Sequence, residues 1–194
     1  MALAIRGRMR LEPGQPAIPF SAQTIDGTTV SLNQFAGRPV LLMFFRYASC
    51  PMCNLHLHDF AKHYTRLRDR GLAVVAFFHS PAHTIRAHAG GRQYAFPLVA
   101  DPDFRVYRLY GVETSWPRIL LSIVSPSFYV AFVRSMLHGF WGGIAWQMAK
   151  MPADFLVGPD GRLVAANYGR DIGDHLPVAQ LHALLDQLGG NDDR

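Results

Sequence analysis

Two runs of consecutive apolar residues stand out in the hydrophobic pattern of the chain. They cover residues 39–45 (PVLLMFF) and 72–78 (LAVVAFF). A strand that is apolar on both faces belongs in the middle of a sheet covered on both sides, which is typical of α/β folds. Between the runs, apolar side chains recur at the spacing of one helix face, at Cys53, Leu57, Phe60, Tyr64 and Leu67. The pattern therefore predicts a right-handed strand–helix–strand crossover with parallel strands.

Turn sequences divide two further pairs of β-prone segments. Asp26-Gly27 lies within 25–30, and residues 158–161 (GPDG) separate 153–157 from 162–168. Asp-Gly pairs and turns rich in glycine and proline are typical of β-hairpins. We therefore expect two hairpins, the first of them near the N-terminus.

Shorter helical segments complete the pattern. Residues 31–35 are expected to form one helical turn, and 102–110 a helix with Asp101 as a candidate N-cap. The last helix opens at Pro177, a residue favoured in the first helical turn. Together with the crossover helix, these segments predict about four helices around one sheet of roughly four or five strands.

Composition restricts the class of protein. The 194 residues are 49% hydrophobic and 17% charged, enough to fill the core of one domain, which we expect to span 1–194. A net charge of +5, scattered along the chain, gives no reason to expect a nucleic-acid partner. In the first ten residues, basic side chains follow a short apolar stretch, the reverse of a secretory signal, so we expect a cytoplasmic location.

The two cysteines carry the candidate chemistry. They form the motif Cys50-Pro51-Met52-Cys53 at the expected junction of strand and helix. The helix N-terminus favours a thiolate at Cys50, whereas Cys53 falls on the core-facing stripe and should be less acidic. We expect Cys50 to attack and Cys53 to resolve the product. The alternative is a pair of ordinary buried thiols; a zinc site needs more ligands than the neighbouring histidines supply, so we expect no metal.

Several polar residues are candidates to assist the dithiol. Arg46 can stabilise a Cys50 thiolate, the alternative being a solvated residue at a strand end. His56 follows Cys53 by one helical turn and can shuttle a proton, the alternative being an ordinary helix residue. His79 lies at the carboxyl end of the second apolar run, the edge where open α/β sheets place their sites. The polar turn 170–175 is expected to serve capping and salt bridging.

Five segments resemble one known family. They are 25–32 (IDGTTVSL), 38–53 (RPVLLMFFRYASCPMC), 101–112 (DPDFRVYRLYGV), 151–161 (MPADFLVGPDG) and 168–177 (YGRDIGDHLP). In these segments the chain is similar to the peroxiredoxin-like (AhpC/TSA) proteins of the thioredoxin-fold superfamily, in particular those with a CPxC motif. The resemblance implies an α/β thioredoxin-like fold in which helices flank a central mixed sheet. An N-terminal β-hairpin and a helical insertion near 113–150 complete that fold.

The resemblance also implies a function. A member of this family is a thiol-dependent oxidoreductase that reduces peroxides and is recycled by an external thiol system such as thioredoxin or glutathione, with no bound organic cofactor. Pro152 takes the place of the cis-proline that faces the dithiol in this superfamily.

The chain departs from the family at one position. Peroxiredoxins carry Thr or Ser three residues before the attacking cysteine, where this chain has Tyr47, and Ser49 is at the wrong offset. Two alternatives therefore stay open, a thioredoxin-like protein disulfide reductase and a redox-sensing binding module.

The segment 119–149 is unusually apolar. Two stretches of 15 residues, 119–133 and 135–149, contain no Asp, Glu, Lys or Arg, and each is shorter than the ~20 residues needed to cross a bilayer. Trp116, Trp141 and Trp146 lie in or beside this segment. We expect a helical lobe that covers one end of the sheet or forms a homodimer interface through 117–149. A hydrophobic substrate groove or a membrane-surface contact is the alternative.

Overall fold

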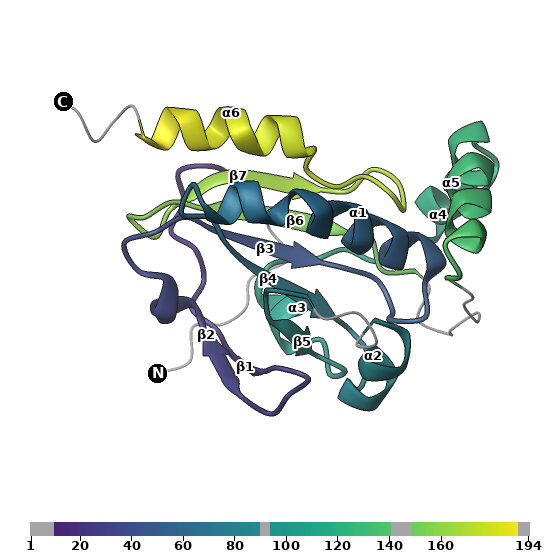
Figure 1. Cartoon of the computed structure of the whole chain (residues 1–194), viewed down its shortest axis with the longest axis horizontal. Coiled ribbons are helices and arrows are strands. Elements are labelled where there is room, and N and C mark those ends of the chain that lie inside the picture. Colours follow the sequence, from purple (N-terminus) through teal and green to yellow (C-terminus); the bar gives the residue numbers. More distant parts are fainter. Residues whose placement is uncertain (1–9, 90–93, 141–148, 190–194) are drawn as a thin grey trace.

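A five-stranded mixed sheet forms the centre of the fold (Figure 1). The computed structural model describes residues 10–89, 94–140 and 149–189. The strand order is β5–β4–β3–β6–β7, with β3 Val40–Phe44, β4 Ala73–Phe78, β5 Leu98–Ala100, β6 Ala153–Val157 and β7 Leu163–Tyr168. β3, β4 and β5 are parallel, whereas β6 runs antiparallel to both β3 and β7. The predicted mixed sheet and the parallel crossover are therefore confirmed.

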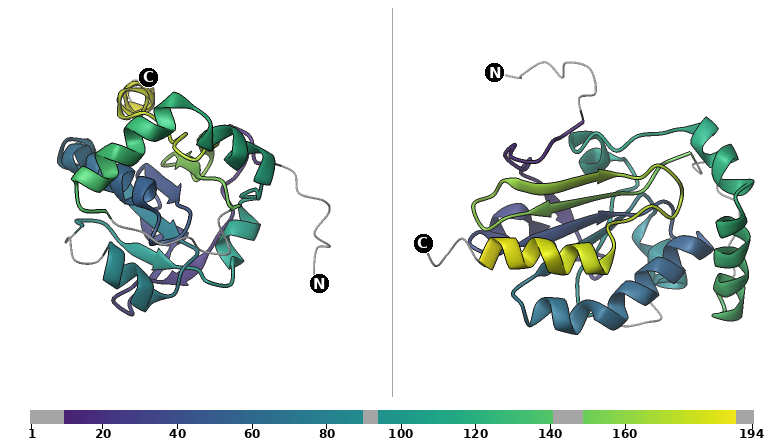
Figure 2. Two further views of the ribbon diagram at one scale, coloured as in Figure 1. Left: turned by 90° about the vertical axis from the view of Figure 1, so that its right-hand side faces the viewer. Right: turned by 90° about the horizontal axis from the view of Figure 1, so that it is seen from above.

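The apolar runs are buried on both faces because the sheet is covered on both sides. Along β3, Leu41 and Met43 face one core and Leu42 and Phe44 the other, as the alternation of side chains in a strand requires. Helices α1 (Pro51–Arg68) and α6 (Val178–Gly189) lie on the first face (Figure 2). Helix α3 (Arg105–Leu109) and the N-terminal segment pack on the second.

Both predicted hairpins are present. The first joins β1 (Ser21–Gln23) to β2 (Thr29–Ser31), and its turn places Gly27 at φ +82, a backbone region in which glycine is favoured. A 3-10 turn, η1 (Leu32–Phe35), follows directly. The second hairpin joins β6 and β7 through the GPDG turn.

Helix α3 begins later than the sequence pattern predicts. The Asp101 carboxylate accepts hydrogen bonds from the backbone N–H groups of Arg105 at 2.8 Å, Val106 at 2.8 Å and Tyr107 at 3.2 Å. Asp101 therefore caps the helix from four residues before its start, while Phe104 takes the left-handed conformation at φ 56. The predicted start at 102 was wrong because the carboxylate reaches over an intervening turn. A further short helix, α2 (Ala82–His88), was not predicted.

The insertion is helical where the structure describes it. Helix α4 (Trp116–Ile123) and helix α5 (Pro126–Leu137) stand at one end of the sheet (Figure 2), and Arg134 of α5 binds Asp59 of α1 at 3.2 Å. Trp141 and Trp146 lie outside the described residues. Within those residues, no single helix is long and apolar enough to cross a membrane; Trp116–Ile123 and Phe128–Leu137 reach that length and apolarity only as a pair bent by 77°.

Candidate active site

Cys50 is the N-cap residue of α1 and lies at the carboxyl edge of the sheet, after the loop that follows β3. Its Sγ accepts a hydrogen bond from the Cys53 backbone N–H at 3.4 Å, and Pro51 fills a first-turn position that needs no donor. Both cysteines are reduced and each is only 2% exposed. The helix start therefore aims its unpaired N–H groups at the Cys50 sulfur.

Arg46 supplies a cation beside this sulfur. Its Nη1 lies 3.9 Å from Cys50 Sγ, and its Nε donates to the Lys150 carbonyl at 3.1 Å. The guanidinium also stacks over the Tyr47 ring at 5.4 Å. Since Arg46 is only 3% exposed, its charge is weakly screened by water and acts strongly on its neighbours.

These contacts push the pKa values of the two thiols apart. A hydrogen bond from the Cys53 thiol, the Arg46 charge and backbone N–H groups lower the pKa of Cys50 to about 6, against the opposing effect of burial. Burial, and then the neighbouring Cys50, raise the pKa of Cys53 well above its ordinary value. At neutral pH the site therefore holds a thiolate at Cys50 and a protonated thiol at Cys53.

Further hydrogen bonds fix the loop that carries Cys50, and sequence reasoning missed both residues that make them. Asn54 Nδ2 donates to the carbonyls of Ala48 at 2.7 Å and Cys50 at 3.0 Å. Ser80 Oγ accepts from the Ala48 backbone N–H at 3.0 Å. The position of Asn54, one turn into the helix, was a signal that could have predicted its contacts. The contact of Ser80 depends on the pairing of β4 with β3 and could not be predicted from local sequence.

The other candidate residues lie farther from the sulfur or lack the expected geometry. His79 is buried and stacks on Phe104, with ring centroids 5.0 Å apart, and its ring lies 6.4 Å from that of Tyr47. Ser49 is half-buried, and no hydrogen bond joins it to Cys50 in the part of the chain that the structure describes. Burial raises the pKa of Tyr47, so its phenol stays protonated beside the thiolate.

Pro152 departs from the form implied by the family resemblance. The described residues contain no cis peptide bond, so the bond before Pro152 is trans. The residue is buried, and a Cβ at Gly169 would lie 2.7 Å from its Cγ. The loop after β7 thus packs directly on Pro152, and only glycine allows this close approach.

The polar turn 170–175 only partly fits its predicted role. Arg170 and Asp174 form the expected salt bridge at 3.4 Å. His175 instead turns into the core, where its Nδ1 lies 3.0 Å from Asp154 Oδ1. His56, on α1, stacks on His175. The Asp inside the apolar segment ADFLV was the signal that could have revealed this buried group.

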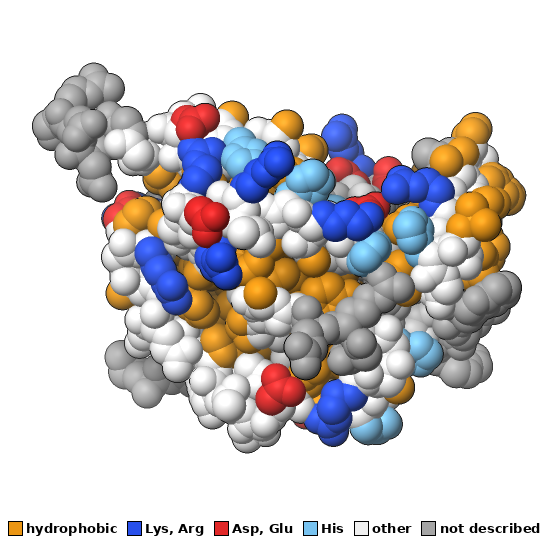
Figure 3. Space-filling view, in the orientation of Figure 1, with side chains coloured by type: hydrophobic (Ala, Val, Ile, Leu, Met, Phe, Trp, Pro, Cys, Tyr) orange, Lys and Arg blue, Asp and Glu red, His pale blue; other side chains and the backbone are white. Residues whose placement is uncertain are grey.

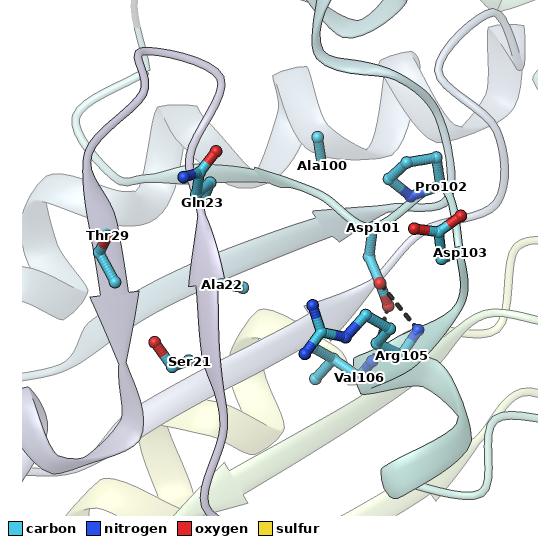
Figure 4. Close-up of a pocket in the computed structure, with 10 residues that line it drawn as sticks. All are labelled: Ser21, Ala22, Gln23, Thr29, Ala100, Asp101, Pro102, Asp103, Arg105 and Val106. Atoms are coloured by element: carbon cyan, nitrogen blue, oxygen red, sulfur yellow. Dashed lines mark hydrogen bonds between the residues drawn. The ribbon is translucent and has the colours of Figure 1, made fainter.

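Cavities border the sheet in several places in the described part of the chain, and two of them are close in size. One, of about 390 Å³, reaches the dithiol motif at Met52 and is otherwise lined by residues of α4 and α5, by Ser125 between them and by the loop 171–174. The other, of about 350 Å³, lies between the β1–β2 hairpin and the segment entering α3 (Figure 4). No residue of the dithiol loop lines the second cavity, so the first is the one that concerns the site.

The fold and this dithiol define a thiol-dependent oxidoreductase of the thioredoxin fold. The family model described as "AhpC/TSA family" matches residues 13–166. The chain belongs to the AhpC/TSA family, as its sequence motifs indicated. It is therefore a peroxiredoxin-like, thiol-dependent oxidoreductase.

Individual relatives and structures agree with this assignment. A putative peroxiredoxin of Mycobacterium tuberculosis is 29% identical over 124 residues, which cover 62% of this chain and 79% of that protein. Chloroplastic peroxiredoxin Q of Triticum aestivum is 30% identical over 95 residues, 49% of this chain and 44% of that protein. The reduced 2-Cys peroxiredoxin of Plasmodium vivax superposes with a TM-score of 0.68 at 14% identity, covering 94% of this chain and 84% of that one.

Proposed function

We propose that the protein reduces hydroperoxides with Cys50 as the attacking thiolate and Cys53 as the resolving thiol. The observation that carries this proposal is the pair of donors around Cys50 Sγ. The sulfur accepts hydrogen bonds from the Cys53 backbone N–H at 3.4 Å and from Arg46 Nη1 at 3.9 Å. These donors stabilise the thiolate and also face the position where negative charge develops on the peroxide oxygen. They supply the polarisation that a Thr in place of Tyr47 would otherwise provide.

The reaction proceeds in three balanced steps. The Cys50 thiolate attacks the outer peroxide oxygen, the O–O bond breaks, and the leaving alkoxide or hydroxide takes a proton from solvent. The Cys53 sulfur then displaces the hydroxyl of the Cys50 sulfenic acid, giving a disulfide and water. An external thiol system, such as thioredoxin or glutathione, supplies two thiols that reduce this disulfide to the Cys50 and Cys53 thiols and are themselves oxidised to a disulfide.

The burial of both sulfurs favours a small oxidant. With Cys50 only 2% exposed, hydrogen peroxide reaches the sulfur more easily than the disulfide of a folded protein does. This supports the peroxidase over the alternative of a protein disulfide reductase. We also propose a cytoplasmic location, because the thiol systems that would reduce the Cys50–Cys53 disulfide are found in the cytoplasm.

Trapping the intermediate tests the assignment of the two cysteines. In Cys53→Ser, hydrogen peroxide should produce a sulfenic acid at Cys50 that dimedone captures, detected by intact mass. In Cys50→Ser, no such adduct should form at Cys53 at a comparable rate. Adducts at Cys53 with Cys50 unmodified would contradict the assignment.

We further propose that the helix pair α4–α5 is a homodimer interface. Its outer face exposes large apolar side chains, among them Leu121 at 69%, Val124 at 72% and Leu137 at 81%, and these gather at one end of the molecule (Figure 3). Contiguous apolar surfaces of this kind are typical of interaction sites. The basic side chains of these helices pair with acidic partners, Arg118 with Glu113 and Arg134 with Asp59.

The oligomeric state tests this interface. Sedimentation equilibrium at micromolar concentration should give a dimer for the wild type and a monomer for Leu121→Glu. A wild-type monomer would contradict the proposal, and binding of that monomer to lipid vesicles would favour a membrane contact instead.

A further inference from the structure

A buried polar cluster lies against α1, the helix that carries the dithiol. The Asp154 carboxylate, on β6, accepts from the Leu176 backbone N–H at 2.6 Å, and both of its oxygens lie 3.0 Å from His175 Nδ1. Asp154 is 1% and His175 7% exposed. Polar groups are costly to bury unless they are hydrogen-bonded, and here the contacts also fix the orientation of the His175 ring.

His56 extends this cluster toward the dithiol. Its ring stacks on His175 with centroids 4.0 Å apart and planes 13° apart, and Phe45 packs against both. Burial, and then the neighbouring His175, lower the pKa of His56 well below its ordinary value, so its imidazole is neutral. Its Nε2 is buried and has no hydrogen-bond partner among the described residues. A buried polar atom left without a partner calls for an explanation, and a catalytic role is one.

The helix places His56 one turn after Cys53. The two residues are three apart on α1, so they share one face. Aromatic side chains on a helix lean toward its N-terminus, over the residues three and four positions earlier, which for His56 are Cys53 and Met52.

The other ionisable groups around Cys53 are Cys50, Arg46, Tyr47 and Tyr107. Cys50 is the oxidised partner in the resolving step, and Arg46 is a permanent cation. Burial raises the pKa of both tyrosines, so each keeps its own proton. None of these four groups accepts the proton of Cys53.

We propose that His56 is the base that deprotonates Cys53 in the resolving step, with His175 as the residue that positions its ring and Asp154 as the carboxylate that orients His175. The inference rests on the proposed function, because it assigns a base to its second step. A thiol that stays protonated is a poor nucleophile and requires such a base.

The proton balance of the step follows from this arrangement. The Cys53 S–H bond breaks and its proton moves to His56. The Cys53 thiolate attacks the Cys50 sulfur, the S–S bond forms, and the S–O bond of the sulfenic acid breaks. The leaving hydroxide takes a proton back from the imidazolium and departs as water, so one thiol and one sulfenic acid give one disulfide and one water.

An assay that bypasses peroxide isolates this step. Dithiodipyridine first forms a mixed disulfide at Cys50 and releases one thiopyridone; attack by Cys53 then releases the second, and that rate reports the deprotonation of Cys53. We expect His56→Asn to slow the second release by about 10²-fold at pH 7, within the range for loss of a general base. The rate of the variant should rise steeply with pH, up to the high pKa of Cys53, whereas the wild-type rate should be nearly flat between pH 6 and 8.

Control variants separate catalysis from structure. His58→Asn, two residues along the same helix, should leave both releases unchanged, and His56→Asn should leave the first release unchanged. Asp154→Asn should slow the second release less than His56→Asn, and the double variant should be no slower than His56→Asn alone. His56→Gln serves as the second variant if His56→Asn does not fold.

The outcome is decided by the second release. A rate within twofold of wild type in both His56 variants, with the same pH profile, would overturn the proposal. Failure of the peroxidase function would appear elsewhere, as slow oxidation of Cys50 by hydrogen peroxide, while the release assay still reports on His56.

Discussion

Removal of the Arg46 charge should raise the pKa of the attacking thiol. At the 3.9 Å between Arg46 Nη1 and Cys50 Sγ, a charge pair in an effective dielectric of about 20 interacts by about 4 kcal/mol, equivalent to about three pKa units. That figure is an upper limit, because the Cys53 hydrogen bond and backbone groups contribute to the same reduction, from 9.0 to about 6. We therefore expect Arg46→Gln to raise the pKa of Cys50 by about one to two units.

The consequence at pH 7 is large enough to measure. The thiolate fraction of Cys50 should fall from about nine tenths to between about a half and a tenth. Gln retains an amide donor for the Lys150 carbonyl, so the substitution removes charge more than it removes structure.

The assay is the pH dependence of Cys50 alkylation by iodoacetamide, measured in Cys53→Ser, which keeps a hydroxyl donor. Arg170→Gln is the matched control, because Arg170 is 91% exposed and lies away from the sulfur. A Cys50 pKa in Arg46→Gln that stays within about 0.3 units of the parent would contradict this role of the Arg46 charge.

Three further predictions follow from other contacts. Asp101→Ala leaves three backbone N–H groups of α3 without their acceptor and should lower the free energy of unfolding by about 2–3 kcal/mol, measured by urea denaturation; an effect below about 0.5 kcal/mol would contradict the capping role. Leu57→Ala, at a side chain with 0% exposure, should cost about 2–5 kcal/mol in the same assay, and a near-neutral result would contradict its place in the core. The Cys50 thiol has a pKa near 9.0 in the unfolded chain and about 6 in the folded protein, so the unfolded state binds more protons between these two pH values. The free energy of unfolding of the reduced protein, relative to Cys50→Ser, should therefore rise from pH 6 to pH 9 by up to about 4 kcal/mol. A fall over this range would contradict the direction of the pKa shift.

Local pattern was enough to predict the parts of the fold that bury continuous apolar runs. The two central strands and α1 follow from the apolar runs 39–45 and 72–78 and from the helical spacing of apolar residues between them. Any other secondary structure in these segments would expose many of their apolar side chains to water. The start of α3 was missed because Asp101 caps it over an intervening turn.

Only part of the site follows from sequence. The CPMC motif and Arg46 are local, and their places relative to one another follow from the strand–helix junction. The buried Asp154–His175–His56 cluster is not local. It depends on the pairing of Met43 with Asp154 across β3 and β6 and on the loop that returns His175 to α1. No spacing along the chain encodes those contacts.

The most direct test of the peroxidase activity is the rate at which the reduced protein forms the Cys50–Cys53 disulfide with stoichiometric hydrogen peroxide, read by intact mass after quenching. We expect a rate orders of magnitude above that of free cysteine, and we expect Cys50→Ser to abolish it. A rate no greater than that of free cysteine would contradict the peroxidase and leave disulfide exchange as the chemistry of this dithiol.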